Sequence, residues 1–368
     1  MKQSRITNKT FYIMQVTRYE IDMLNVKSAD AFLIHFWDDE TNYEYVVLID
    51  GGNYEDGTDI AKFVRTHYSC NNIDLVICSH CDKDHFGGIT YLLEQQRDNG
   101  KDNMNINQIW INDPAKHVLN GEIKWCQWTS HYVKKVKARS VYDLDDHDNL
   151  FEIIDTLRDK QKIICFEPFS DAYAKGQISY CASGLIRIMG PTIEYYNSLV
   201  PDFRNDLQKK EGGYDSDETQ EQIAELRFGC VYSKTLDEAE DDPSSHNRSS
   251  VIVLFQPSDG NKFLFLGDAC RDSINNIPQD LVSEIKDVYW LKVPHHGSKH
   301  NLDSDIINHL HPKVAFISTE KYGHYLSKAV VNALNKLGAR VYSTNNNGSM
   351  CHHNNTPAHN GYSSATPL

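Results

Sequence analysis

Short apolar runs separated by turn-forming residues divide the first third of the chain into candidate strands. Runs of this length that are rich in aliphatic and aromatic residues are typical of buried strands. The runs cover residues 10–16, 31–37, 45–49 and 73–78. Residues 58–68 favour a helix, and Gly87-Gly88 is expected to form a turn into a further helix from Ile89 onward.

The same pattern of strands and turns returns after residue 245. The segment between the first two of these strands holds proline, aspartate and glycine, which predicts a hairpin. Residues 327–337 favour a helix between the last two strands. The expected strands cover residues 250–255, 262–266, 287–293, 314–318 and 340–344.

The middle of the chain follows this pattern less clearly, with strand candidates at residues 108–111 and 185–191. We therefore predict a single domain over residues 1–350 with a large insertion at about 100–245. Its part at 205–245 is expected to be acidic and flexible. Residues 351–368 are a polar tail without a core pattern, and we expect this tail to be frayed.

Four metal-capable side chains follow the apolar run that ends at Cys78: His80, Asp82, Asp84 and His85. A helix would scatter these positions around its circumference, whereas a tight loop at a strand end can turn them to one point. Imidazole and carboxylate groups are ordinary ligands of zinc and related divalent metals. Such a cluster would be costly in a folded interior without a cation. A polar surface loop is the alternative, and it explains the flanking strand and glycines less well.

Further candidate ligands recur at the ends of later strands. Asp268 follows the strand at 262–266, and the pair His295-His296 follows the strand at 287–293. His246 and Asn247 precede the strand at 250–255. Each of these alone is typical of a turn or a surface position. Their repeated placement next to strands predicts one shared site, in which a carboxylate such as Asp268 can bridge two cations.

Composition limits the class of protein. The hydrophobic fraction of 40% and the charged fraction of 24% are typical of a soluble globular protein. The chain has neither an apolar run long enough to span a membrane nor an apolar core after its basic N-terminus, so we expect a cytoplasmic protein without membrane contact. Nine cysteines, an odd number, favour reduced thiols over a disulfide framework.

Charge is concentrated in two segments. Residues 215–242 contain ten acidic and two basic residues in a chain of net charge −14, which is typical of a solvated loop. An acidic lid, or a docking surface for a protein partner on the insertion, is the alternative. Residues 124–139 interleave aromatic with basic residues, a pattern that can bind a nucleic-acid strand. We prefer an amphipathic helix that packs its tryptophans.

Taken in order, these motifs resemble the metallo-β-lactamase fold superfamily, and within it the hydrolase domain of ComEC-like competence proteins. The resemblance implies a mixed α/β (α+β) fold, a four-layer αββα sandwich with the site at one edge of the two sheets. It also implies a metal-dependent hydrolase. The matching segments are residues 28–31, 48–52, 79–88, 247–250, 265–268, 291–298, 322–324 and 341–344 with Gly348.

The resemblance implies a site for two divalent metal ions. His80 and Asp82 would hold the first ion, Asp84 and His85 the second, and Asp268 would bridge them. The superfamily has histidine where this chain has Asp82. The site is therefore richer in oxygen, and manganese is an alternative to zinc.

Two ligand positions stay open. The family ligand precedes a small residue and then serine, which favours His296 over His295 in the second metal site. ComEC-like proteins have asparagine at the position of Asn247, whereas many relatives have a histidine ligand nearby, so either His246 or Asn247 could face the metals.

The expected activity is that of a phosphodiesterase or nuclease that uses a metal-bridging hydroxide. Asp84 would orient or deprotonate the water, and His324 would assist the leaving oxygen. The partner would be a phosphodiester substrate, such as a single-stranded nucleic acid or a nucleotide. One alternative is a carbonyl-ester hydrolase that acts on a lactone, thioester or β-lactam. Another is a metal-binding regulatory or partner subunit with little turnover.

Overall fold

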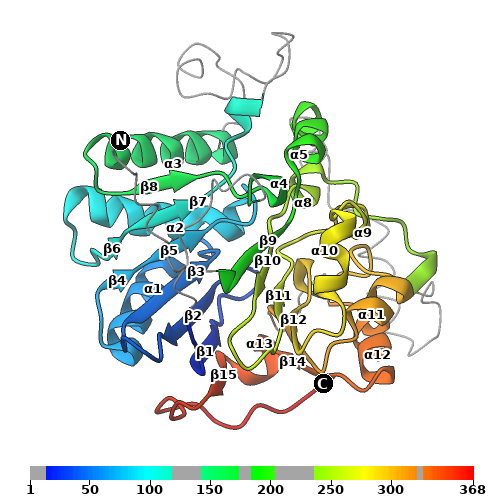
Figure 1. Cartoon of the computed structure of the whole chain (residues 1–368). Helices are drawn as coiled ribbons and strands as arrows, with labels where there is room; N and C mark the ends of the chain where they lie inside the picture. Colours follow the sequence, from blue (N-terminus) through cyan, green and yellow to red (C-terminus); the bar gives the residue numbers. More distant parts are fainter. Residues whose placement is uncertain (1–13, 118–141, 174–183, 204–235, 321–325) are drawn as a thin grey trace, which may run out of the picture.

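Two β-sheets packed face to face, with helices on both outer faces, make up the protein (Figure 1). The computed structural model describes residues 14–117, 142–173, 184–203, 236–320 and 326–368. The four-layer αββα arrangement expected from the sequence motifs is confirmed. No helix in these ranges has the length and apolar character needed to cross a membrane.

The first sheet has seven strands in the order β15-β1-β2-β3-β5-β7-β8. Strands β15, β1, β2 and β3 are antiparallel, and β3, β5, β7 and β8 run parallel. A short parallel pair, β4 (Asn72–Ile73) and β6 (Asn105–Ile106), lies apart from it. The strands are β1 (Arg18–Met23), β2 (Phe32–Trp37), β3 (Glu44–Ile49), β5 (Leu75–Ile77), β7 (Gln108–Trp110), β8 (Ile164–Phe166) and β15 (Met350–Asn354).

The second sheet has six strands in the order β14-β13-β12-β11-β10-β9. The predicted hairpin is confirmed, because β10 and β11 pair antiparallel. Strands β11 to β14 run parallel, so their carboxyl ends meet at one edge. The strands are β9 (Ile186–Gly190), β10 (Ile252–Phe255), β11 (Phe263–Phe265), β12 (Trp290–Lys292), β13 (Val314–Ile317) and β14 (Arg340–Ser343).

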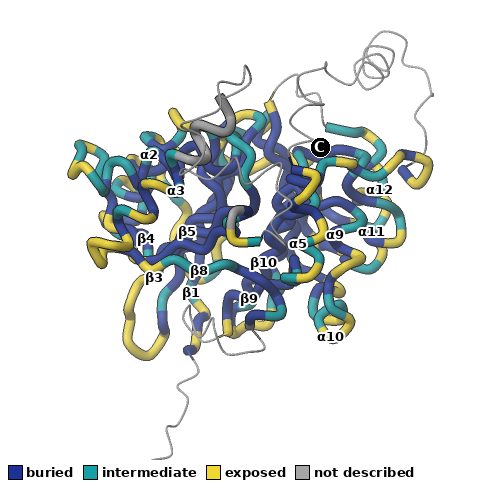
Figure 2. Tube along the Cα trace, turned by 90° about the horizontal axis from the view of Figure 1, so that it is seen from above, coloured by how far each residue is buried: buried dark blue, intermediate teal, exposed yellow. Residues whose placement is uncertain are grey.

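Two groups of helices cover the outer faces (Figure 2). The first sheet is covered by α1 (Asp56–Phe63), η1 (Val64–Tyr68), α2 (Lys83–Asp98) and α3 (Tyr142–Asp159). The second is covered by α9 (Arg271–Asn275), α10 (Gln279–Val282), η8 (Ser283–Ile285), α11 (Ser304–Leu310) and α12 (Lys328–Lys336). The remaining short helices are η2 (Pro114–His117), α4 (Ser170–Tyr173), α5 (Ile193–Leu199), η6 (Val200–Asp202), η7 (Leu236–Glu238), α8 (Ser245–Arg248), η9 (His295–Gly297) and α13 (Thr344–Asn347).

The hydrophobic residues form three cores, one between the sheets and one under each layer of helices. Side chains that alternate along the strands contribute to different cores. In β2, Phe32, Ile34 and Phe36 point between the sheets, whereas Leu33 packs under the helices of the first layer. Successive side chains of a strand point to opposite faces, so one strand serves two cores. The core between the sheets is rich in aromatic rings, and Phe32 meets Phe265 of the second sheet edge to face.

The structure corrects three expectations about the chain outside the site. The strand expected at 10–16 lies largely outside the described residues; β1 begins at Arg18 and was missed, because Glu20 and Asp22 interrupt its apolar pattern. The region 100–245 is not a separate insertion, since β7, β8 and β9 complete the two sheets. The tail is not frayed at its start, because residues 350–354 pair with β1.

Gly87 and Gly88 lie inside α2, which begins at Lys83, and not in a turn before it. A Cβ atom added at Gly88 would lie 2.0 Å from the Gly51 carbonyl oxygen. The glycines therefore let the helix approach the loop after β3, which brings two parts of the site together.

We expect Gly88→Ala to destabilise the fold by about 1–3 kcal/mol, because backbone atoms must move to relieve the overlap. Chemical denaturation would measure the change. Gly190→Ala is the matched control, since its nearest neighbour would be an ordinary 3.5 Å contact with Ile252. Equal losses in the two variants would contradict the explanation.

Candidate metal centre

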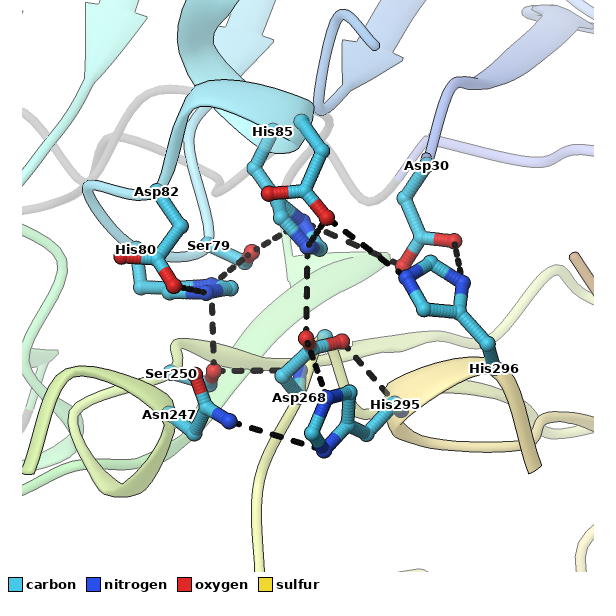
Figure 3. A network of polar contacts seen from close by, with 12 residues as sticks. Asp30, Ser79, His80, Asp82, His85, Asn247, Ser250, Asp268, His295 and His296 are labelled. Atoms are coloured by element: carbon cyan, nitrogen blue, oxygen red, sulfur yellow. Dashed lines mark hydrogen bonds and ion pairs between the residues drawn. The ribbon is translucent and has the colours of Figure 1, made fainter. Parts of the chain in front are cut away.

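All nine residues that the sequence proposed as metal ligands gather at one edge of the sandwich, where strands of both sheets end. Figure 3 labels His80, Asp82, His85, Asn247, Asp268, His295 and His296 among them. They come from the loop after β5, the first turn of α2, the short helix α8 and the loops after β11 and β12. The nine are His80, Asp82, Asp84, His85, His246, Asn247, Asp268, His295 and His296.

The first group consists of His80, Asp82 and His246. Asp82 is the N-cap residue of α2, yet its side chain makes no capping hydrogen bond. Its carboxylate instead lies 3.7 Å from His80 Nε2 and 3.3 Å from His246 Nδ1. The opposite nitrogen of His80 is near the hydroxyls of Ser79 and Ser250, at 3.1 and 3.3 Å. These contacts direct His80 Nε2 toward the carboxylate.

The second group consists of Asp84, His85 and His296. Asp84 Oδ2 lies 3.8 Å from His85 Nε2 and 3.6 Å from His296 Nε2. His296 Nδ1 is 3.0 Å from the Ser318 carbonyl oxygen, which can only accept, so this nitrogen carries the proton and Nε2 has a lone pair for a metal. His296 therefore has a nitrogen lone pair beside Asp84, and its choice over His295 as the ligand stays a prediction.

Asp268 connects the two groups. Its Oδ2 lies 3.4 Å from His85 Nε2, and one donor atom each from Asp268, His80 and His85 lie within 4.8 Å of one another. Its other oxygen, Oδ1, accepts a hydrogen bond from the His295 backbone and lies 3.5 Å from Lys292 Nζ. Asp268 thus lies next to both groups, and its role as a bridging carboxylate stays a prediction.

Three buried carboxylates that the sequence left without a role support the centre. Asp50 holds His85, with its Oδ2 2.9 Å from His85 Nδ1, and so directs the other ring nitrogen at Asp268. Asp30 pairs with the buried Lys292 between the sheets. Asp242 accepts from Asn247 at 2.7 Å. All three are at most 6% exposed.

His295 is oriented by Asp242. The Asp242 carboxylate lies 3.0 Å from His295 Nδ1, which leaves Nε2 on the side of Asp268, 4.0 Å away. Asp242 is the last residue of the acidic segment 215–242. The described part of this segment, from residue 236 onward, is folded and contains η7. Within the segment expected to be flexible, residues 236–245 are folded, and residues 205–235 lie outside the described part of the chain.

Backbone in the left-handed region places three of these side chains. His295, His296 and Asp50 have φ values of 45°, 54° and 57°. A residue other than glycine costs roughly 1–2 kcal/mol there. Such positions persist where the surrounding structure fixes them, and they are common at functional sites.

Mutual attraction between these groups governs their charge. Burial alone would raise the pKa of Asp268, but His85, His295 and Lys292 hold it well below its usual range. Burial would lower the pKa of Lys292, but Asp30 and Asp268 outweigh burial and raise it. Lys292 therefore stays a fixed cation between two carboxylates.

The donors fit divalent metal ions. Two ligands of one tetrahedral zinc ion are each about 2.0–2.1 Å from the metal and therefore lie about 3.3 Å from one another. The observed distances between histidine Nε2 and carboxylate Oδ2 atoms are close to this value, at 3.4 Å for His85–Asp268, 3.8 Å for His85–Asp84 and 3.6 Å for His296–Asp84. His80 Nε2 is buried and has no hydrogen-bond partner among the described residues. A buried nitrogen aimed at carboxylates is an expected feature of a metal ligand.

Three predicted features lie wholly or mostly outside the described residues: His324, the basic and aromatic segment 124–139, and the acidic segment up to residue 235. Three residues that act on the ligands were missed as functional, although Asp30, Asp50 and Lys292 stand within the motifs that carried the family resemblance. Asp242 was read only as part of a charged segment. The only feature of the sequence that could have placed Asp242 at the site is its closeness to His246.

The family model described as the metallo-beta-lactamase superfamily matches residues 28–118. This span holds Asp30, Asp50 and the ligands from His80 to His85. This match confirms the resemblance to the superfamily over residues 28–118, and clusters of His and Asp among the described residues are spaced so that they could hold a metal ion.

Two similar proteins can be named. ComE operon protein 3 of Bacillus subtilis (strain 168) is 32% identical over 131 residues, which cover 35% of this chain and 16% of that protein. The chain thus spans a small part of the length of this relative. The crystal structure titled hydrolase AbOPH in beta lactamase superfamily is 13% identical with a TM-score of 0.33, over 92% of this chain and 79% of that one. This structural likeness is too weak to carry a conclusion.

We expect Asp50→Asn to weaken metal binding or activity about 10–100-fold, because His85 would lose the carboxylate that orients its ring. Competition with a chromogenic chelator would measure the affinity. Asp102→Asn is the control, since Asp102 accepts from Tyr91 and has no contact with the ligands among the described interactions. Unchanged affinity in Asp50→Asn would contradict the orienting role.

Proposed function

We propose that this protein is a metal-dependent hydrolase, a phosphodiesterase or nuclease that acts with two divalent ions, manganese or zinc, on single-stranded nucleic acid or a nucleotide. The carboxylate-rich donor set carries the proposal: Asp82, Asp84 and Asp268 face one shared space. Oxygen donors suit manganese as well as zinc. Two-metal centres with bridging carboxylates are common in phosphatases and nucleases. The local similarity to ComE operon protein 3 agrees with the ComEC-like resemblance that implied this activity.

When bound, the cations would supply an activated water and neutralise charge on the phosphoryl oxygens. Asp84 has 34% of its side chain exposed, against 4% for Asp268, so it faces the side open to substrate. There it can hold the attacking water and accept its proton. His295, with 16% exposed, is placed by Asp242 to donate to a substrate oxygen. The role of His324 stays a prediction.

A cavity of about 460 Å³ along the neighbouring face of α2 supports a substrate of nucleotide size. Lys83, Gly87 and Thr90 line it along one face of the helix. Tyr54 stands at the rim with 45% exposed, and an exposed ring of this kind can stack on a base. A lysine beside the ligand loop is suited to a phosphate.

The experiment is a substrate panel with protein reloaded with manganese or zinc after chelation. Metal analysis accompanies turnover of bis(p-nitrophenyl) phosphate, single-stranded DNA, double-stranded DNA and RNA. A second panel contains a lactone, a thioester and a β-lactam. The proposal expects metal-dependent cleavage of the phosphodiesters, with single strands preferred over duplex because the net charge of −14 opposes non-specific duplex binding.

Two results would overturn the proposal. Turnover of the carbonyl esters without phosphodiester cleavage would assign the same centre to acyl chemistry, which a metal-activated water also serves. Absence of turnover on both panels in metal-loaded protein would favour a binding subunit.

A further inference from the structure

A second cluster of metal-capable side chains lies on the outer face of the first sheet, where the C-terminal segment covers β1. It consists of Glu20 and Asp22 from β1, Cys351 from β15 and His359 from the tail. Asp22 and Cys351 are register partners in neighbouring strands, so their side chains point to the same face. This cluster shares no residue with the centre around His80.

The geometry of the cluster suits a small metal ion. One donor atom each from Asp22, Cys351 and His359 lie within 4.8 Å of one another. His359 Nε2 lies 3.1 Å from Asp22 Oδ2 and 3.7 Å from Glu20 Oε2. Neighbouring ligands of a tetrahedral zinc ion lie about 3.3 Å apart, so both distances require only small adjustments.

One carboxylate oxygen of Asp22 is buried and lacks a conventional hydrogen-bond donor among the described residues. Its side chain has no exposed surface, and Oδ1 has no hydrogen-bond partner in the part of the chain that the structure describes. The Cys351 thiol, a weak donor, interacts with the Asp22 carboxylate. A buried carboxylate oxygen normally accepts conventional hydrogen bonds, and a cation would satisfy this one.

Hydrogen bonds outside the cluster hold the donors in place. Tyr68 donates to Asp22 Oδ2 at 2.6 Å, and His35 Nδ1 lies 3.3 Å from Glu20 Oε2. The tail is fixed just before His359, because Asn354 and Asn355 both donate to the Thr17 carbonyl oxygen. Partners that orient ligating carboxylates in this way are typical of metal sites.

We propose that Asp22, Cys351 and His359, with Glu20 as the nearest fourth ligand, form a structural zinc site that fastens the C-terminal segment to the sheet. A soft thiolate with one imidazole and carboxylates favours zinc over manganese or magnesium. Binding replaces the thiol proton of Cys351 and the imidazole lone pair of His359 coordinates, with no change of oxidation state. The site is separate in residues and ligand type from the proposed catalytic centre.

Cobalt substitution tests the site directly, because a cobalt ion bound by thiolate absorbs in the near ultraviolet. None of the nine candidate ligands around His80 is a cysteine, so this absorption would not come from those ligands, and the Cys351 variant assigns it to the second cluster. The apo full-length protein is titrated with cobalt, and metal content is measured after zinc loading. We expect the wild type to show this absorption. Cys351→Ser should lose the absorption and should bind one equivalent of zinc less than the wild type.

Two further variants complete the experiment. Cys165→Ser is the matched control, because Cys165 lies in β8 at the opposite edge of the same sheet, and it should keep the absorption. His359→Ala removes a ligand from the tail without touching a strand and should weaken cobalt binding by more than about 10-fold. Absence of the absorption in the wild type, its persistence in Cys351→Ser, or unchanged cobalt affinity in His359→Ala would overturn the proposal.

Discussion

Asp84→Ala is expected to lower the rate of phosphodiester cleavage by more than about 100-fold. Loss of a residue that only orients a metal ligand costs about 10–100-fold, and Asp84 is placed to act both on a metal and on the attacking water. Its carboxylate stands between His85 and His296 at 3.8 and 3.6 Å. Turnover of bis(p-nitrophenyl) phosphate at saturating metal would measure the loss.

Asp155→Ala is the control for this variant, because Asp155 is an exposed carboxylate of α3 paired with Arg158. It should retain the full rate. Metal content must be measured in both proteins, which separates a lost ligand from a lost proton acceptor. Equal residual rates in the wild type and Asp84→Ala would remove Asp84 from the mechanism and the candidate centre from the proposed reaction.

Lys292→Met is expected to destabilise the fold by about 3–5 kcal/mol. Lys292 is 1% exposed and pairs with Asp30, which has no exposed surface. Removing one partner of a buried pair leaves the other charge uncompensated in the interior. Lys292 also donates to the Gly267 carbonyl oxygen, which fixes the loop that carries Asp268. The shift of the urea midpoint at constant slope would give the change in unfolding free energy.

The double variant Lys292→Met with Asp30→Asn distinguishes charge from packing. Because neither charge then remains, we expect it to be more stable than Lys292→Met alone. A double variant that loses the sum of the two single effects would show that the pair is not coupled. The two charges would then have no joint role in holding the sheets together at the site.

Elements whose apolar pattern is local were predicted well from the sequence. The hairpin of β10 and β11 and the unit of β13, α12 and β14 occur where the apolar periodicity placed them. The missed strand β1 has charged residues at every second position. Glu20 and Asp22 are buried because His35, Tyr68 and His359 reach them from remote parts of the chain. No window of the sequence contains that information.

The candidate centre was also predicted only in part from the sequence. The sequence by itself determined the types of candidate ligand and their order at strand ends, because the motif from His80 to His85 is continuous and the other candidates lie next to recognisable strands. Only the tertiary structure decided which nitrogen of each histidine faces inward. Asp50 and Ser318 fix His85 and His296, and Asp242 fixes His295. Side-chain orientation depends on hydrogen bonds between residues that folding alone brings together.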